Sequence, residues 1–421
     1  MGKKNGTAFR VRLLIRKLIQ KALPRKIRHA LLRRFLELDP APSPRLKVRL
    51  ARTQEELEAA FGLLHDAYVK SGFMDPHDSG LRVTKYHSLP ATSTIIALWD
   101  GEVVGTVSLI RKSSFGMPLE SIFDVSHLTD DGSRIFETSS LAVHPRFSGQ
   151  HGMVLFPLIK FFVEYAYNYF GSKYMAIAVN PAWIEFYEAI FGVTRLTPKP
   201  IDNYSFVKGA PAVGAYVDLI SAPVDLVKIY GKNPIQKNMR EYLFNLKMPN
   251  LEFPDRKFSK ISDPVLTPEL IDYFFNIKTQ TFTTMTEREV LTLHQLYQDN
   301  DFKAILPPQP IVSNVWKMRA DIRLEVNYTG YIYLPQNIRI PIFITEISRG
   351  GMSIVTDRDL RADEFFSIVV MVDGVEHRLP RAKMTWTFSN QRRCGIILLE
   401  IPASWENMVT ILRNDILMKV S

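Results

Sequence analysis

The sequence predicts an α/β domain followed by an all-β unit that ends in a helix, with a basic helical segment before both. Three observations support this prediction. Helical and strand-like stretches alternate from about residue 46 to residue 219, short alternating strands follow residue 310, and the basic excess lies near the start of the chain. At 421 residues the chain is long enough for two or more domains, each with its own core.

Composition is typical of a globular protein in a reducing compartment. The chain is 46% hydrophobic and 23% charged, and no run approaches the roughly 18 apolar residues of a membrane span. Its single cysteine, Cys394, excludes an intrachain disulfide and a cysteine-built metal site, which favours the cytoplasm. The nine histidines show no HExxH or paired metal-ligand spacing, so no metal is expected.

The net charge of +10 comes from one short segment. Residues 1–36 hold 12 of the 53 basic residues and no acidic residue, and the rest of the chain carries 41 basic against 43 acidic residues. The chain therefore lacks the general basic surface of a nucleic-acid-binding protein.

The basic segment, residues 1–45, predicts two amphipathic helices and a proline-rich linker at residues 39–44. Pro24 separates the helices, whose apolar stripes are Val11, Leu14, Leu18 and Ala22, then Ile27, Leu31, Phe35 and Leu38. Three uses remain open for it: an interfacial helix on the anionic inner-membrane surface, a helix docked on its own protein, and a docking site for an acidic partner.

The region from residue 46 to residue 225 predicts one α/β domain. Asp100-Gly101 is a hairpin turn between two strands, and the other elements follow from hydrophobic periodicity. In order we expect helix Glu55–Lys70, strands Thr94–Trp99, Val103–Leu109 and Ile135–Val143, helix Met153–Phe170, strand Tyr174–Val179 and helix Ala182–Ile190.

A mainly helical connecting region, residues 226–310, is expected next. Its clearer helices are Glu269–Lys278, which Pro268 begins, and Glu287–Tyr297. The prolines at 307, 308 and 310 mark the boundary of a last domain, residues 311–421. There Asp373-Gly374 predicts a hairpin, and the closing helix presents Trp405, Met408, Leu412 and Ile416 on one face.

Two motifs stand in this last domain. Arg319 and Arg323 are four apart, and Glu346-Ile-Ser-Arg-Gly-Gly351 follows after one strand and one loop. Together they resemble the PilZ domain, a bacterial receptor module for cyclic di-GMP marked by RxxxR and [D/N]xSxxG. The resemblance implies a β-barrel and a cyclic di-GMP site, and it departs from the pattern at Glu346.

The chemistry of the implied ligand suits these residues. Arginine guanidinium groups form paired hydrogen bonds with phosphates and with the O6/N7 edge of guanine. A serine hydroxyl and the flexible backbone at the glycines can then contact the other side of the ligand. The alternative is a surface arginine pair and an ordinary Ser-Gly-Gly turn. The residues expected to bind cyclic di-GMP are Arg319, Arg323, Glu346, Ser348, Arg349, Gly350 and Gly351.

The α/β region carries a second resemblance. The order of its elements, together with Gly116–Glu120, Phe136–Pro145 and Asn180–Tyr187, is similar to the GNAT fold of acyltransferases, with a mixed sheet flanked by helices. The closer likeness is to acyl-homoserine lactone synthases and FeeM-like N-acyl amino acid synthases. This resemblance implies transfer of an acyl group from a thioester, on acyl carrier protein or coenzyme A, to an amine.

Such a reaction needs a base for the amine and an N–H donor for the tetrahedral oxyanion. Glu137, on a predicted strand, is the first candidate base, and His144, just past that strand, is the second. Tyr187 stands where the fold often carries a tyrosine that protonates the leaving thiolate. Each also has a structural alternative: a buried carboxylate, a loop histidine, and a tyrosine packed with Trp183 and Phe186.

The expected donor site begins at the end of the same strand. Its backbone would bond the pantetheine arm, and the following loop would hold phosphate. In that loop His151 occupies a position where the family has a small residue, which favours acyl carrier protein over coenzyme A because its arm has one phosphate. The donor residues are expected to be Leu141, Ala142, Val143, Arg146, Gly149 and Gly152.

The whole sequence therefore predicts an N-acyltransferase that moves a fatty acyl group from acyl carrier protein to an amine such as an amino acid, under the control of cyclic di-GMP. One alternative is a non-catalytic cyclic di-GMP effector that uses a degenerate GNAT fold to bind a partner, an acyl carrier or a membrane. Another is a plain acetyl-coenzyme A-dependent acetyltransferase, which Arg146 and Gly149 leave open.

Overall fold

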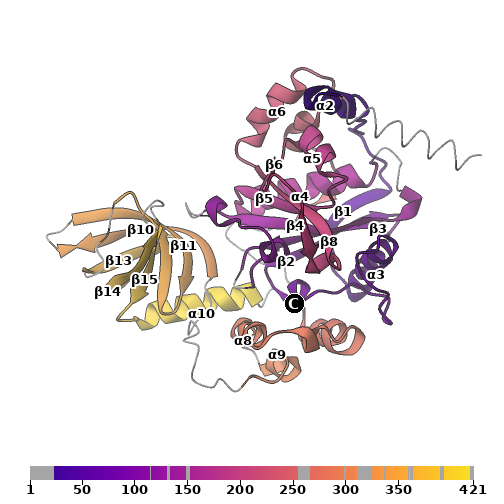
Figure 1. Cartoon of the computed structure of the whole chain (residues 1–421). Helices are drawn as coiled ribbons and strands as arrows, with labels where there is room; N and C mark the ends of the chain where they lie inside the picture. Colours follow the sequence, from indigo (N-terminus) through magenta and orange to yellow (C-terminus); the bar gives the residue numbers. More distant parts are fainter. Residues whose placement is uncertain are drawn as a thin grey trace, which may run out of the picture.

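A computed structural model describes residues 23–113, 115–129, 133–147, 152–254, 266–297, 300–310, 324–335, 338–358, 360, 364–388 and 393–417 (Figure 1). The first predicted basic helix, with Val11, Leu14, Leu18 and Ala22, lies outside these residues. The same is true of Gly149 and His151, and of Arg319 and Arg323.

The α/β body is built on one mixed sheet, in the order β6-β8-β5-β4-β3-β2-β1-β9, with β7 paired to β8. Among the strands that the structure describes, only the pairs β4–β5 and β1–β9 of this sheet are parallel. The predicted strands are confirmed within two residues, and Asp100 and Gly101 form the turn with φ of 52° and 88°. The strands are β1 Leu46–Leu50, β2 Thr92–Trp99, β3 Glu102–Arg111, β4 Ile135–Val143, β5 Tyr174–Val179, β6 Thr194–Arg195, β7 Ile201–Tyr204, β8 Ala210–Asp218 and β9 Leu251–Glu252.

Helix α4 (Leu155–Phe170) covers one face of this sheet. It is apolar nearly all round, and Phe161, Tyr165 and Ala166 are fully buried against the strands. Gly171, in the left-handed conformation at φ 55°, ends the helix. The helices α5 (Ile184–Phe191), α6 (Ala222–Tyr230) and α2 (Arg25–Arg34) lie on the same side (Figure 1).

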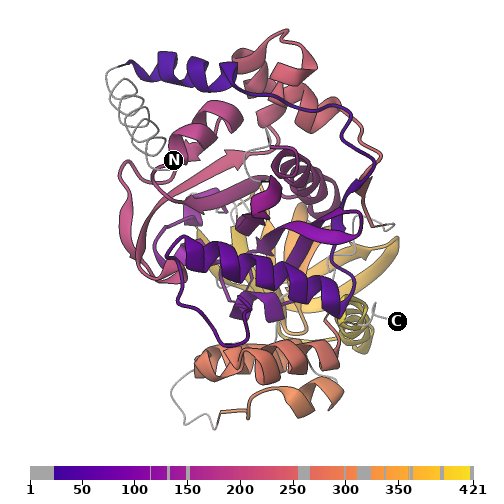
Figure 2. The same ribbon diagram turned by 90° about the vertical axis from the view of Figure 1, so that its right-hand side faces the viewer.

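The other face is covered by α3 (Gln54–Lys70) and by part of the region expected to connect the domains. Phe274 meets Phe61 of α3 edge to face at 5.2 Å between ring centroids, and Leu293 and Tyr297 are buried in the same core. Figure 2 shows α3 and then these helices as successive layers below the sheet. The described part of residues 266–306 is therefore built into the α/β core.

The local signals in this region explain its helices. Thr267 caps α7 (Pro268–Ile271), which continues as a π-helix over Asp272–Lys278 where an uninterrupted α-helix was expected. Thr286 and Glu289 form a capping box at the start of α8 (Glu287–Leu296). Short helices over Glu241–Asn245, a π-helix, and Asn300–Ile305, α9, complete it.

Helix α2 docks on its own protein through its basic side, and its apolar stripe does not form the contact. Its arginines face α5, where Arg28 Nε lies 2.5 Å from Glu185 Oε1 and Arg25 pairs with Glu188 at 2.9 Å. The apolar side chains of Ile27 and Leu31, and of Phe35 just after the helix, are 46%, 40% and 70% exposed. Leu38 lies beyond the helix end and is buried in the core.

The C-terminal unit is a closed antiparallel barrel in the order β10-β11-β12-β15-β14-β13. Asp373 and Gly374 form the predicted hairpin turn, with φ of 48° and 85°. Trp405 of α10 (Ala403–Leu417) is fully buried, and its Nε1 donates to the carbonyl of Ser348 at 3.3 Å. The strands are β10 Leu324–Leu334, β11 Ile338–Ser348, β12 Gly351–Val355, β13 Phe365–Val372, β14 Val375–Phe388 and β15 Arg393–Leu398.

Candidate active site

The parallel strands β4 and β5 separate in the middle of the sheet. They pair only from Ile135 to Glu137, although β4 runs on to Val143. Beyond Glu137, β4 keeps only β3 as its ladder partner among the described strands. The backbone on its other side faces the gap, where it is free to bond an extended ligand.

A bulge in β4 adds to this separation. The register with β3 shifts between Thr106 and Ser108, and Ser140 takes a φ of 53°, which is unusual for a residue other than glycine. The bulge turns the strand at the point where the gap opens. Such local strain is common at functional sites.

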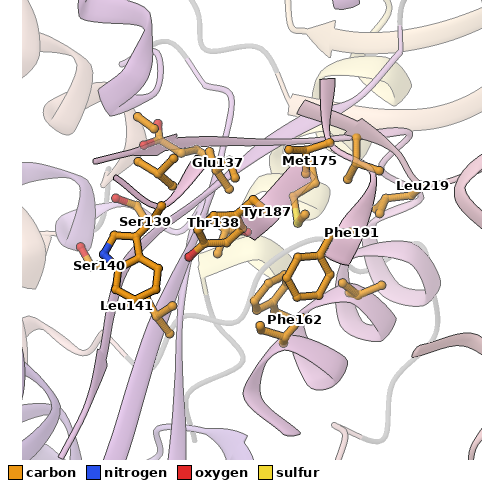
Figure 3. Close-up of a pocket in the computed structure, with 18 of the residues that line it drawn as sticks. Glu137, Thr138, Ser139, Ser140, Leu141, Phe162, Met175, Tyr187, Phe191 and Leu219 are labelled. Atoms are coloured by element: carbon orange, nitrogen blue, oxygen red, sulfur yellow. The ribbon is translucent and has the colours of Figure 1, made fainter. Parts of the chain in front are cut away.

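A pocket of about 220 Å³ opens at this separation and runs between the sheet and helices α4 to α6. Figure 3 shows Glu137 and Leu219 on opposite sides of the view, with Tyr187 and Phe191 between them. Apolar side chains make up most of its wall, which suits an acyl chain. Among them are Ile159, Phe162, Val163, Met175, Ile177, Phe191, Val193, Val217, Leu219, Ala222, Leu226, Leu243 and Phe244.

Glu137 is the acidic group of this pocket. Its side chain is 1% exposed, and Oε2 accepts the backbone N–H of Leu119 at 2.8 Å. Burial raises the pKa of this carboxyl to about 8, because desolvation outweighs the single hydrogen bond that favours the charged form. A carboxyl with a pKa near the working pH is suited to take a proton from an amine.

Tyr187 lines the same pocket from α5. It packs edge to face on Phe186, as expected for its structural alternative, and tilted on Phe191, while Trp183 packs on Phe186. Burial also raises its pKa to about 12, which keeps the hydroxyl protonated at neutral pH. Its packing therefore holds a proton donor inside the pocket.

Two further tyrosines belong to the pocket wall and were not singled out from the sequence. Tyr68 comes from the end of α3 and Tyr204 from β7, and Tyr204 is buried with no hydrogen-bond partner for its hydroxyl among the described residues. Burial and the nearby Glu137 carboxylate both raise the pKa of Tyr204. Neither tyrosine lies in a motif, so only the fold brings them to Glu137.

His144 is separated from this pocket. It is exposed and lines a different groove with Arg146 and three glutamates, and its Nδ1 accepts the backbone N–H of Arg146 at 3.2 Å. Arg146 in turn pairs with Glu102 at 3.5 Å. The structure thus places Glu137 and Tyr187 together and His144 elsewhere.

We therefore expect a His144→Ala variant to keep acyl transfer within about three-fold of the unaltered protein, because a general base must lie within hydrogen-bond reach of its substrate. Initial rates of thiol release from a long-chain acyl donor would measure this. A loss of a hundred-fold or more would restore His144 as the base.

The expected donor residues are divided between the strand and its loop. Leu141 lines the pocket, whereas Ala142 and Val143 pair with Thr106 and Gly105 of β3. Gly152 has a φ of 74°, and a Cβ there would lie 2.4 Å from the ring of Phe156. Glycine at this position is thus explained by local backbone and packing.

The second motif of the barrel spans the β11–β12 turn. The Ser348 hydroxyl donates to the Gly351 carbonyl at 3.1 Å, and Arg349 pairs with Glu406 of α10 at 3.4 Å. A Cβ on Gly351 would lie 2.4 Å from the carbonyl oxygen of Ile396. These contacts account for the serine and the glycine as parts of a turn, and Arg319 and Arg323 lie outside the described residues.

Neither a metal cluster nor a helix that could cross a membrane occurs within the part of the chain that the structure describes.

Comparison with known proteins yields one family. Residues 59–218 match the model of the N-acyl amino acid synthase FeeM family. No curated protein matches the chain.

Three of the solved structures to which the chain is similar are acyltransferases. FeeM, an N-acyl amino acid synthase from uncultured soil microbes, is 21% identical over 43% of this chain and 95% of its own, with a TM-score of 0.38. The coenzyme A-dependent acyl-homoserine lactone synthase BjaI is 19% identical, covering 50% and 94%, with a TM-score of 0.35. A GNAT-family acetyltransferase from Streptococcus pneumoniae is 14% identical, covering 41% and 98%, with a TM-score of 0.29. From the family match, residues 59–218 form an N-acyltransferase domain similar to the N-acyl amino acid synthases.

Proposed function

We propose that this domain transfers a long-chain acyl group from acyl carrier protein to the amine of an amino acid, with Glu137 as the general base. The observation that carries the proposal is the position of Glu137. Its carboxyl lies in an apolar pocket at the point where β4 and β5 separate. A base, a site for an extended thioester and room for an acyl chain therefore meet at one place.

The reaction then follows from the side chains. Glu137 takes a proton from the acceptor's ammonium group, and the free amine attacks the thioester carbonyl to form a tetrahedral oxyanion. Backbone N–H groups of the unpaired side of β4 stabilise that oxyanion. Collapse breaks the C–S bond, and Tyr187 supplies a proton to the departing thiolate. The nitrogen then loses its second proton, which passes to the Tyr187 oxygen directly or through water, so that the amide forms and Tyr187 is restored.

Acyl carrier protein is preferred to coenzyme A on two grounds. The exposed Lys26 and Arg34 of α2 offer positive charge to an acidic carrier. The two donors differ in the adenosine diphosphate part, for which the imperfect glycine loop offers a poorer phosphate site.

The first experiment is thiol release by the purified full chain, with pooled amino acids as acceptors and palmitoyl groups on either acyl carrier protein or coenzyme A. Faster release from the carrier protein, with an amide product detected by mass, is the expected result. Equal or faster release from coenzyme A would reject the carrier preference. No amide from either donor, with chain length and acceptor varied, would favour the non-catalytic effector.

We further propose that the barrel binds cyclic di-GMP and thereby alters the transfer rate. A closed barrel with Ser348-Arg349-Gly350-Gly351 at the β11–β12 turn supports this. Calorimetric titration of the full chain with cyclic di-GMP, set beside Arg319→Ala and Arg323→Ala, tests binding. Binding that leaves both rate and substrate affinity unchanged would assign the barrel to partner binding, and no binding would reject the site.

Helix α2 provides a further expectation, that the chain associates with anionic lipid. Because Ile27, Leu31 and Phe35 are exposed beside basic residues, they can enter the acyl boundary of a bilayer. Replacing all three with serine is expected to weaken binding to phosphatidylglycerol-containing vesicles at least ten-fold in co-sedimentation. Ile277→Ser, an exposed isoleucine elsewhere, is the control, and equal losses in both variants would contradict the role of α2.

A further inference from the structure

Arg82, in the segment between α3 and β2, is a buried cation beside the pocket. Its side chain is 8% exposed, and its guanidinium carbon lies 4.0 Å from the ring centre of Tyr68 and 4.9 Å from that of Phe206. Nη2 donates to the Phe206 carbonyl at 2.7 Å, Nη1 donates to the sulfur of Met74 at 3.8 Å, and the Tyr68 hydroxyl also interacts with the guanidinium. Nε has no hydrogen-bond partner among the described residues.

This arginine has no carboxylate partner within the part of the chain that the structure describes, and the groups that act on its pKa are the two tyrosines Tyr68 and Tyr204. Arginine is almost never buried without one, because removing its charge from water is costly unless an anion compensates. Burial accordingly lowers its pKa. A buried, unpaired guanidinium with a free N–H is the arrangement expected of a site that awaits an anionic ligand.

The position of Arg82 links it to Glu137. Tyr68 and Phe206, whose rings enclose the guanidinium, both line the pocket that holds Glu137. Tyr204 lies within electrostatic reach of both charges, since Glu137 raises its pKa and Arg82 lowers it. The Tyr204 hydroxyl, which has no hydrogen-bond partner among the described residues, therefore lies near both groups.

We propose that Arg82 anchors the carboxylate of the acyl acceptor while Glu137 receives the proton of its amine. The proposal rests on the proposed function and deepens it, because it assigns recognition of the amino acid's carboxylate to one side chain. The free Nε–H and a terminal N–H provide the two-pronged contact that a carboxylate fits. Tyr204 and Tyr68 offer hydroxyls between the two ends of the acceptor.

The test compares acceptors that differ only in the carboxylate. With the unaltered full chain and a palmitoyl donor, phenylalanine is expected to be acylated at least ten-fold faster in kcat/KM than phenylalanine amide or phenethylamine. Arg82→Gln is expected to lose about 10- to 100-fold in kcat/KM with phenylalanine, mainly through KM, and to leave phenethylamine within about three-fold.

Two further measurements separate the possible outcomes. Arg82→Lys keeps the positive charge but lacks the two-pronged guanidinium contact. Its kcat/KM with phenylalanine is therefore expected to lie between those of the unaltered protein and Arg82→Gln. Should Arg82→Gln fail to fold, the acceptor preference of the unaltered protein and of Arg82→Lys still decides the question. Equal rates with and without the carboxylate would overturn the anchor while the acyltransferase stands. An absence of amide with every acceptor would instead remove the proposed function itself.

Discussion

A Glu137→Gln variant is expected to lose about 10²- to 10⁴-fold in the rate of amide formation, the usual contribution of a general base. Glutamine has nearly the same shape, and its amide oxygen can still accept the Leu119 N–H that Oε2 accepts at 2.8 Å. The pocket should therefore survive while its base is removed. The measurement is kcat/KM for amide product with a long-chain donor.

The matched control is Glu269→Gln, the same chemical change at an exposed carboxylate in the first turn of α7. It should behave as the unaltered protein. If both variants keep full activity, Glu137 is a structural carboxylate and the base lies elsewhere. A loss confined to Glu137→Gln, with an unchanged far-ultraviolet circular dichroism spectrum, assigns the base to this side chain.

The unaltered protein and Glu137→Gln together also test the raised pKa of Glu137, without any substrate. A folded-state pKa of about 8, against an unfolded value near 4.5, means that the native state holds this proton more tightly. The stabilisation is fully present below pH 4.5 and is lost as pH rises toward 8, at up to about 1.4 kcal/mol per pH unit. The unfolding free energy of the unaltered protein, minus that of Glu137→Gln, should fall across this window, and a flat difference would contradict the buried carboxyl.

Much of the α/β body could be predicted because its elements carry local signals. The apolar periodicity of residues 153–170 and the Asp100-Gly101 turn each specify a structure without reference to the rest of the chain. Glu137 could be proposed because it stands on a predicted strand within a stretch similar to a known fold. The same local logic predicted the Asp373-Gly374 hairpin of the barrel.

What could not be predicted depends on contacts between distant segments. Arg82, Tyr68 and Tyr204 lie in no motif, and only the packing of β7 and the end of α3 brings them to Glu137. The direction in which α2 docks was also hidden, because it depends on ion pairs between its arginines and two glutamates of the distant helix α5. Of the aromatic residues of α4, only Phe162 lines the pocket, while Phe161 and Tyr165 pack in the core.

The second large expected effect is on the preference for acyl-chain length, and it concerns the apolar end of the pocket. Leu219 of the chain segment after β8 lies across the pocket from Glu137 (Figure 3) and is buried. A Leu219→Trp variant fills this end, and we expect it to exclude the last three or so methylenes of a long chain. At about 0.8 kcal/mol for each buried methylene, the loss is about 2.4 kcal/mol, or roughly 60-fold in kcat/KM.

Donors with shorter acyl chains should keep their kcat/KM, because those chains end before Leu219. The informative quantity is therefore the ratio of kcat/KM for hexadecanoyl and octanoyl carrier protein, which cancels any general loss from overpacking. Leu219→Met, close in volume, is the control and should keep the ratio of the unaltered protein. If Leu219→Trp lowers kcat/KM equally for both donors, the acyl chain does not reach Leu219. The acyl chain must then extend from the β4–β5 gap along another side of the pocket.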